Sequence, residues 1–345
     1  MQLVSTVARE IQQIGSLYST YVVVCDANVY QLHREYLYES LTPLKPAAWL
    51  TIPAGEAAKT RAQKACLEDA LFTRRIQRDA CLIACGGGAT SDLVGFCAAT
   101  YLRGIDYVNI PTTLLAMVDA SVGGKTAINT SWGKNSLGAF HPSCLVICDP
   151  YFLESLPSAQ MRSGFAEVVK YAAVYDRSLF EEIISARGGD KQAIIRRCIA
   201  IKSEVVRRDP QDQGMRKWLN FGHTVGHGLE LMTQYRLLHG DAVALGMAVE
   251  AKYAALFGDL PLSEETYFQS VLRSFSFPWE ELQKMDKKIL YEVMRRDKKT
   301  LQNQPNGVML QKLGVAHTFN GLYVAPIERE KFFIAYGECI NEMEN

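Results

Sequence analysis

Short apolar runs alternate with helical patterns over the first 150 residues of the chain. The runs that predict strands are Tyr21–Cys25, Ala48–Ile52, Cys81–Cys85, Ile105–Ile110 and Cys144–Cys148. Helical patterns lie between them, as over residues 57–77 and from Ser91 onward. Apolar strands that do not alternate with polar positions, and that are separated by helices, are typical of a mostly parallel sheet covered on both faces. We therefore expect an α/β domain over residues 1–155.

The pattern changes after Pro150, where helical periodicity dominates. It predicts helices over residues 158–175, 178–186, 191–208, 224–232, 242–257 and 263–273. Two short strands are expected at 307–313 and 321–324, followed by a last helix from Ile327. Residues 156–345 should therefore form a second, mainly helical domain.

Composition narrows the class of protein. Among 345 residues, 48% are hydrophobic, which is enough for a sizeable core, and 37 basic residues balance 37 acidic ones. A formal charge of zero argues against binding nucleic acid or anionic lipid through bulk charge. No apolar stretch approaches the roughly 20 residues of a membrane helix, and the first 15 residues contain no signal-peptide core.

Nine cysteines occur without a CxxC pair. Cys81, Cys85, Cys144 and Cys148 lie inside apolar runs, so we expect them to be buried thiols in a reducing compartment. These features predict a folded cytoplasmic protein with no nucleic-acid or membrane partner.

The segment Gly86-Gly87-Gly88 lies where a predicted strand turns into a helix. Successive glycines let a ligand approach the backbone, and a helix N-terminus presents N–H groups that suit a pyrophosphate. The dinucleotide fingerprint GxGxxG is not met, because Ser91 stands at its third glycine. Asp92 either caps the helix or binds a ligand. A tight turn that needs glycine for its backbone alone is the alternative interpretation.

A second glycine-rich segment contains Gly123-Gly124-Lys125-Thr126. It resembles the end of a P-loop, but Asp119 occupies the position where that motif needs glycine, so the motif is excluded. Lys125 and the pair Lys134-Asn135 remain on glycine-rich backbone. Such lysines often face solvent, but two of them among so many glycines favour an anion site.

Three of the six histidines, His223, His227 and His239, fall within 17 residues. His223 and His227 are one helical turn apart, a spacing that allows two imidazoles to bind one metal ion. His239 begins the next helical stretch, and Glu167 offers a carboxylate on a largely apolar helix. The residues predict a zinc-like site, and their spacing leaves open which three of the four bind.

Basic residues recur in the second half, at Lys170, Lys202, Arg216 and the pair Lys298-Lys299. Each alone is typical of a solvated helix face. Lys170 and Lys202 follow apolar residues, however, and we expect partial shielding. Together with a metal ion, they suit a substrate that carries phosphate and carboxylate.

Taken in order, these segments resemble the 3-dehydroquinate synthases of the sugar-phosphate cyclase superfamily. The resemblance spans residues 21 to about 314 and rests on these blocks: Gly86-Gly87-Gly88 with Asp92, Arg103-Gly104, Pro111–Ala116, Val118–Thr126, Gly133-Lys134-Asn135, Ala166–Lys170, Asn220–His227 and His239-Gly240. It implies an N-terminal Rossmann-like NAD-binding domain, a helical domain that binds metal and substrate, and a homodimer.

The implied reaction converts 3-deoxy-D-arabino-heptulosonate 7-phosphate to 3-dehydroquinate and phosphate, in the shikimate pathway. NAD transiently oxidises a substrate hydroxyl, phosphate is eliminated, the ketone is reduced again, and the ring closes by an intramolecular aldol step. A zinc or cobalt ion would polarise the hydroxyl and ketone oxygens, while lysines and an arginine bind the phosphate and carboxylate.

The resemblance also implies roles for individual residues. Glu167, His223 and His239 would bind the metal, which moves His227 to the substrate phosphate. The NAD site would be lined by Asp26, Asn28, Glu56, Lys59, Gly87, Gly88, Asp92, Thr112, Thr113, Asp119, Lys125, Lys134 and Ser155. Catalytic or substrate-binding roles would fall to Lys125, Asn135, Lys170, Lys202, Arg216, Asn220, His227 and Asp119, with Arg103 reaching the partner subunit's site and one of Lys298 and Lys299 contributing.

The chain departs from the family pattern at a few positions. Ala89-Thr90-Ser91 replaces a usual Val-x-Gly, Ser155 replaces a common Thr, Asp212 a usual Glu and Ala120 a common Ser. These changes bear on NAD contacts rather than on the reaction. The alternatives are another NAD- and metal-dependent cyclase of the 2-deoxy-scyllo-inosose or valiolone type, a metal-dependent polyol dehydrogenase, and a catalytically inactive binding module of the same fold.

Overall fold

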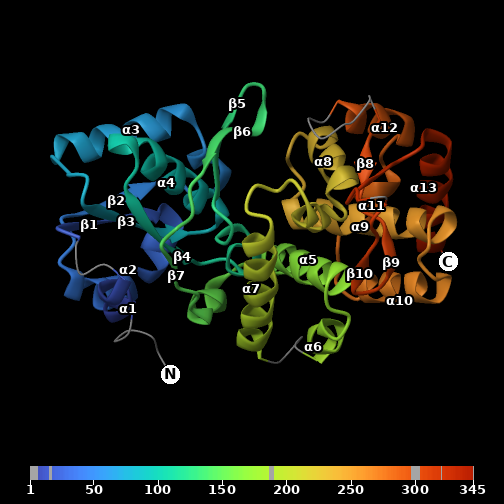
Figure 1. Ribbon diagram of the computed structural model, residues 1–345, viewed down its shortest axis with the longest axis horizontal. Coiled ribbons are helices and arrows are strands. Elements are labelled where there is room, and N and C mark those ends of the chain that lie inside the picture. The colour runs from blue at the N-terminus through green and yellow to red at the C-terminus, as the bar shows by residue number, and fades with distance from the viewer. Residues whose placement is uncertain (1–6, 15–17, 186–189, 297–303, 320, 345) are drawn as a thin grey trace. The chain divides into compact units, whose positions relative to one another are not determined.

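The computed structural model describes residues 7–14, 18–185, 190–296, 304–319 and 321–344. The chain divides into two compact units, Met1–Pro157 and Ser158–Asn345 (Figure 1). Lys298 and Lys299, one of which is expected to contact substrate, lie outside the described residues.

The first unit is built on a parallel five-stranded sheet with the order β2-β1-β3-β4-β7. Its strands are Thr20–Asp26 (β1), Ala48–Ile52 (β2), Ala80–Gly86 (β3), Asp106–Pro111 (β4) and Leu145–Val146 (β7). Every residue of the central strand β3 is buried, which is why its sequence is a continuous apolar run. The predicted α/β fold class is confirmed.

Helices cover both faces of this sheet. They are Val7–Ile14 (α1), Ala27–Leu41 (α2), Arg61–Thr73 (α3) and Gly88–Thr100 (α4), with short helical turns at Thr42–Leu44 (η2), Gly55–Ala58 (η3), Tyr101–Arg103 (η4), Ala116–Ala120 (η5) and Pro150–Ser155 (η6). On one face, Leu67 of α3 and Leu93 of α4 share a core with Leu82 of β3. On the other, Leu37 of α2 and Ile110 of β4 line one small cavity.

The first unit also carries an antiparallel hairpin of Lys125–Thr130 (β5) and Gly133–Phe140 (β6) (Figure 1). The glycine-rich segments around Lys125 and Lys134 were not predicted to be strands. Five of the eight β6 residues are exposed or glycine, so the segment lacks the apolar run that marks the buried strands.

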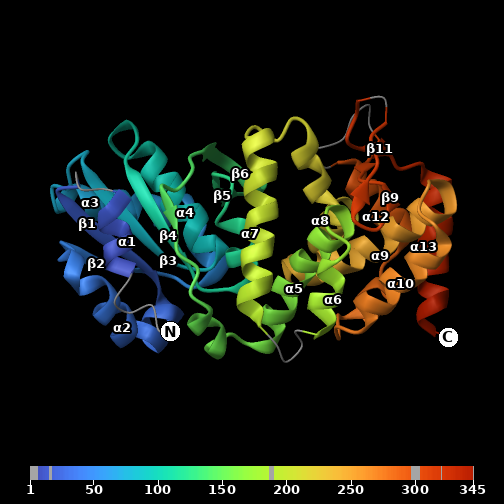
Figure 2. The same cartoon turned by 60° about the horizontal axis from the view of Figure 1, so that its bottom comes forward.

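The second unit is mainly helical. Its helices are Ser158–Val174 (α5), Leu179–Ser185 (α6), Lys191–Arg208 (α7), Met215–Asn220 (η7), His223–Met232 (α8), His239–Phe257 (α9), Leu262–Arg273 (α10), Trp279–Gln283 (α11), Lys287–Arg295 (α12) and Arg329–Glu344 (α13). Helix α9 is buried from Gly240 to Ala254 and packs against α5, α8, α10 and α13 (Figure 2). A helix that is buried on all sides lies at the centre of its unit.

Two short ladders lie between α12 and α13: Asn306–Gly307 (β8) pairs with Ala325–Pro326 (β11), and Leu310–Lys312 (β9) with Val315–Ala316 (β10). The strand predicted over 307–313 is therefore two shorter pieces. The strand predicted over 321–324 was wrong: Gly321 takes a left-handed turn with φ 82°, Leu322 forms only an isolated bridge with Phe319, and the paired strand is Ala325–Pro326.

All nine cysteines lie in the described residues and are free thiols. Cys81 and Cys85 are buried as expected, whereas Cys144 is exposed and Cys148 half-buried. The expectation failed at Cys144 because it precedes β7, which is the edge strand of the sheet. Within the described ranges, no helix has the length and apolar character needed to span a bilayer.

Candidate active site

The carboxyl ends of β1 and β3 meet where the strand order reverses, since β2 lies on one side of β1 and β3 on the other. Such a switch point is the usual ligand site of open α/β sheets. Asp26 ends β1 there, and its Oδ1 accepts hydrogen bonds from the N–H groups of Asn28 (2.9 Å) and Val29 (3.3 Å). Its Oδ2 accepts from Gly55 N–H at 3.2 Å. The carboxylate thus fixes two loops at this edge.

The triple glycine follows β3 at the same edge. Helix α4 begins at Gly88 with Gly87 as its N-cap. A Cβ at Gly86 would lie 2.3 Å from Thr90 Oγ1, and one at Gly87 would lie 3.1 Å from Thr113 Cγ2. Both the turn interpretation and the ligand interpretation therefore need glycine here, and the helix N-terminus points its backbone N–H groups out of this edge.

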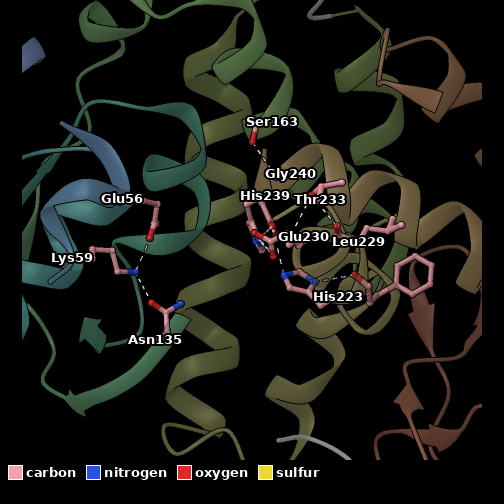
Figure 3. Close-up of polar contacts among 12 residues, drawn as sticks. Glu56, Lys59, Asn135, Ser163, His223, Leu229, Glu230, Thr233, His239 and Gly240 are labelled. Carbon is pink, nitrogen blue, oxygen red and sulfur yellow. Dashed lines mark hydrogen bonds and ion pairs between the residues drawn. The ribbon is translucent and has the colours of Figure 1, made fainter. Parts of the chain in front are cut away.

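Asp92 is not the cap of α4, because the helix begins four residues earlier. The buried Lys59 donates instead to Asp92 Oδ2 at 2.5 Å. It also donates to Asn135 Oδ1 (Figure 3). Glu56 lies 3.9 Å from the same ammonium. Burial raises the pKa of Asp92 above its ordinary value, against the opposing effect of Lys59. One buried lysine therefore ties α4 to strand β6.

The other predicted residues of this unit are spread over several elements. Lys125 is exposed at the start of β5, and Asn135 in β6 takes a left-handed φ of 50°. Thr113 Oγ1 accepts from Ala116 N–H at 3.2 Å, and Ser155 Oγ lies 2.7 Å from His33 Nε2. The remaining predicted positions are Thr112, buried after β4, Asp119 in η5, Lys134 in β6 and Arg103, exposed at the end of η4.

In the second unit, Glu167, His223 and His239 converge from three helices. Glu167 lies within α5, His223 is the first residue of α8, and His239 is the first of α9. Their ligand atoms all lie within 4.8 Å of one another. Glu167 Oε1 is 3.7 Å from His223 Nε2 and 3.4 Å from His239 Nε2. Bonds of about 2.0–2.2 Å put two ligand atoms of a tetrahedral ion roughly 3.3–3.5 Å apart, so this donor set suits zinc or cobalt.

Each imidazole has a separate partner for its other nitrogen (Figure 3). His223 Nδ1 lies 3.2 Å from the carbonyl oxygen of Phe221, and His239 Nδ1 lies 3.4 Å from Glu230 Oε2. Metal-binding histidines commonly donate their second N–H in this way, which directs the free nitrogen at the ion. The arrangement fits a metal centre formed by the two Nε2 atoms and Glu167.

The charges around the site favour a cation. Burial lowers the pKa of His239, but hydrogen bonds to Glu167 and Glu230 outweigh it and raise that pKa to about 10. Glu167 also pairs with the ammonium of Lys170, and both side chains are 1% exposed. The field that would hold a proton on the imidazole is the field that would attract a metal ion.

His227 lies beside this group. Its ring centroid is 5.5 Å from that of His223 and 6.2 Å from that of His239. Among the described residues, no candidate metal group holds both His223 and His227, whereas His227, Glu230 and His239 form a second group within 4.8 Å. The one-turn spacing therefore places the two histidines in contact, and each of them belongs to a different candidate group.

Glycines set the spacing of the two helices that begin with His223 and His239. A Cβ at Gly222, where φ is 79°, would lie 2.3 Å from Met247 Cγ, and one at Gly246 would lie 2.0 Å from Gly222 O. Glu250 of α9 accepts hydrogen bonds from Gly222 N–H (2.8 Å) and Val225 N–H (3.3 Å). A carboxylate from one helix thus caps the other, which has no side-chain cap of its own.

Three predicted cations of this unit are buried: Lys170 is 1% exposed, Lys202 is 6% and Arg216 is 3%. Arg216 Nη1 donates to Pro210 O at 3.0 Å, and Asn220 Nδ2 to Lys217 O at 3.0 Å. Lys170 is paired with Glu167, so at least one of these buried charges is compensated within the unit. Sequence reasoning missed Glu230 and Glu250, since neither lies in a recognisable motif.

The amino-acid sequence matches a known enzyme family. Residues 49–163 match the family model 3-dehydroquinate synthase N-terminal, and residues 164–300 match 3-dehydroquinate synthase C-terminal. The 3-dehydroquinate synthase of Thermoanaerobacter pseudethanolicus is 40% identical over 308 residues, which cover 85% of each chain.

Two solved structures extend the comparison. The 2-epi-5-epi-valiolone synthase of Streptomyces hygroscopicus, solved with NAD+ and Zn2+, has a TM-score of 0.84 at 28% identity, covering 95% of this chain and 92% of its own. A 2-deoxy-scyllo-inosose synthase, solved with carbaglucose-6-phosphate, NAD+ and Co2+, has a TM-score of 0.83 at 23% identity, covering 97% and 95%. The latter likeness shows the fold alone.

Proposed function

The chain belongs to the 3-dehydroquinate synthase family, and we propose that it converts 3-deoxy-D-arabino-heptulosonate 7-phosphate to 3-dehydroquinate and phosphate with the residues described above. The observation that carries the proposal is the Glu167–His223–His239 group, in which both Nε2 atoms face one carboxylate. Nine free cysteines support a reducing, cytoplasmic setting for this shikimate-pathway reaction.

Glu167, His223 and His239 would hold one zinc or cobalt ion. The relatives solved with Zn2+ or Co2+ support this choice of metal, as does the donor set of one carboxylate and two imidazoles. When bound, the ion acts as a Lewis acid on the hydroxyl and ketone oxygens of the substrate. Lys170 neutralises Glu167 from its other side and keeps the carboxylate oriented.

The carboxyl edge of the parallel sheet would hold NAD, which supplies a hydride acceptor and donor when bound. Asp26, Gly87 and Gly88 stand at the switch point, where the backbone permits close approach. The remaining residues proposed for this site are Asn28, Glu56, Lys59, Asp92, Thr112, Thr113, Asp119, Lys125, Lys134 and Ser155. The buried Lys59 would orient Asp92 there through their ion pair.

The substrate is doubly anionic, and we assign its phosphate and carboxylate to cationic and amide side chains. The proposed set is Lys125, Asn135, Lys170, Lys202, Arg216, Asn220 and His227. The family to which the chain belongs supports the assignment, because all seven residues stand in segments that resemble it or in the matched domains. We further propose a homodimer in which the exposed Arg103 reaches the partner subunit's site.

The test is turnover by the purified chain supplied with NAD and zinc or cobalt. Phosphate should be released from the heptulosonate phosphate, and a dehydroquinase should accept the product. Chelator-treated chain is the control and should be inactive until the ion is restored. Turnover of glucose 6-phosphate or sedoheptulose 7-phosphate in place of the heptulosonate would instead indicate the related cyclase activities, and a monomer by light scattering would contradict the dimer.

A further inference from the structure

We propose that Glu230 is a positioning residue of the metal centre, whose carboxylate holds the Nδ1–H of His239 and so directs His239 Nε2 at the ion. The inference rests on the proposed function, since it needs a metal ion at Glu167, His223 and His239. It concerns a residue outside the donor set that acts through one ligand.

Glu230 lies on α8, the same helix as the proposed ligand His223. It lies seven residues after His223 on α8, two turns along the same face. Its side chain is 4% exposed, and Oε2 lies 3.4 Å from His239 Nδ1. On the other side of the ring, Nε2 lies 3.4 Å from Glu167 Oε1. The imidazole of His239 is therefore held between two carboxylates, one on each nitrogen.

The acceptor at Nδ1 decides which nitrogen of His239 carries the proton. A neutral imidazole carries one N–H, and an acceptor at Nδ1 keeps the proton there and leaves the lone pair of Nε2 for a metal ion. A carboxylate acceptor also makes the ring a stronger donor to the ion than a neutral acceptor does. At His223 the acceptor near Nδ1 is the neutral carbonyl of Phe221, at 3.2 Å. The two histidines thus have Nδ1 acceptors of different charge.

The competing role for Glu230 is direct ligation, because His227, Glu230 and His239 also bring their ligand atoms within 4.8 Å. In that arrangement His239 Nδ1 would bind the ion and lose its proton. The two roles exclude each other at this nitrogen. If Glu230 binds an ion, either a second ion binds beside the first, or a single ion binds to His227, Glu230 and His239 and then depends on His227 and not on His223.

The experiment is a titration of the full chain, freed of metal by chelator, with cobalt(II), followed by visible absorption against a competing chelator. Glu230→Gln keeps an acceptor without the charge and should raise the cobalt Kd about tenfold, while Glu230→Ala removes the acceptor and should raise it up to about 100-fold. One ion per chain should bind in each case. The graded order of Glu, Gln and Ala separates positioning from a loss of packing.

Glu265→Gln is the matched control. Glu265 is a 1% exposed carboxylate of the same unit that binds Lys252 and Gln269, away from the histidines, so its loss should leave the cobalt Kd unchanged. An unchanged cobalt Kd in both Glu230 variants overturns the inference. Two ions bound by the wild type and one by Glu230→Gln also overturn it, because Glu230 is then a ligand. A wild type that binds no cobalt contradicts the proposed metal site itself.

Discussion

The two units carry their site residues in opposite ways. In Met1–Pro157, many of them are exposed, as are Asn28 in the first turn of α2, Glu56 in η3 and Asn135 in β6. In Ser158–Asn345, charged groups such as Glu167 and Lys170 are buried within helices at 1% exposure. A buried charge that loses its partner costs several kcal/mol, whereas an exposed side chain costs little. Changes at the exposed site residues of the first unit should therefore affect ligand binding alone, and changes at the buried charges of the second should affect binding and folding together.

The largest effect is expected from removing a metal ligand. His223→Ala should lose the ion and lower turnover about 1,000-fold or more, because several kcal/mol of charge stabilisation disappear with it. His227→Ala should keep the ion while losing turnover, since His227 is assigned to the substrate. Metal analysis of both variants beside the activity assay decides the matter. Retention of metal by His223→Ala together with its loss from His227→Ala would reverse the assignment.

The next effect is on stability. Lys170→Met leaves the buried Glu167 without its ammonium partner and should lower the free energy of unfolding of metal-free chain by about 3–5 kcal/mol. Added zinc should recover much of the loss, because the ion then compensates the carboxylate. Urea unfolding with and without zinc measures both values. A loss of equal size in the two conditions would contradict compensation at Glu167.

A third effect depends on pH. Asp209 accepts backbone hydrogen bonds from Gln213, Gly214 and Arg216. Burial tends to raise the pKa of Asp209, but these donors outweigh it and hold the pKa below its ordinary value of 3.8. A lowered pKa stabilises the fold above pH 3.8, and the contribution is lost as pH falls through the folded value.

At pH 7 the free energy of unfolding of Asp209→Asn should therefore be about 1–3 kcal/mol lower than that of wild type, because the hydrogen bonds to the side chain are weakened. The difference should shrink below pH 3.8. Urea unfolding curves at several pH values measure this difference. If the loss of unfolding free energy is the same at acid pH, the loss arises from packing and not from the ionised carboxylate.

The smallest effect on folding is expected in the first unit. Glu56→Ala removes a half-exposed side chain that accepts from Asn129 Nδ2 at 2.7 Å. The free energy of unfolding should change by no more than about 0.5 kcal/mol, while the NAD Kd rises several-fold. Titration with NAD measures the change in Kd, and urea unfolding measures the change in the free energy of unfolding. A loss of stability like that of Lys170→Met would remove the contrast between the units.

Patterns within single elements could be predicted from the sequence, and pairings between elements could not. The buried strands β1, β3 and β4 follow from apolar runs such as Cys81–Cys85, because a strand covered on both faces needs apolar residues throughout. The hairpin of β5 and β6 was missed, because none of the residues from Gly133 to Phe140 is buried and their polarity alternates weakly.

The same limit applies to the candidate site. Helical spacing places His223 and His227 on one face of α8, but it does not say which face of α5 meets that helix. Only the packed helices bring Glu167 to His223 and His239. Asp92 was weighed as a helix cap or a ligand residue because the sequence cannot show that Lys59, 33 residues away, pairs with it. The resemblance to a family supplied the set that spacing left open.

The origin of the three ligand groups on α5, α8 and α9 has a consequence for how the chain matures. Glu167 precedes His239 by 72 residues, and Gly222 and Gly246 lie in close contact where α8 packs on α9. A nascent chain would therefore offer an ion no complete donor set, and metal capture would follow assembly of the helical unit. During refolding, the appearance of metal binding would thus report when α5, α8 and α9 have packed together.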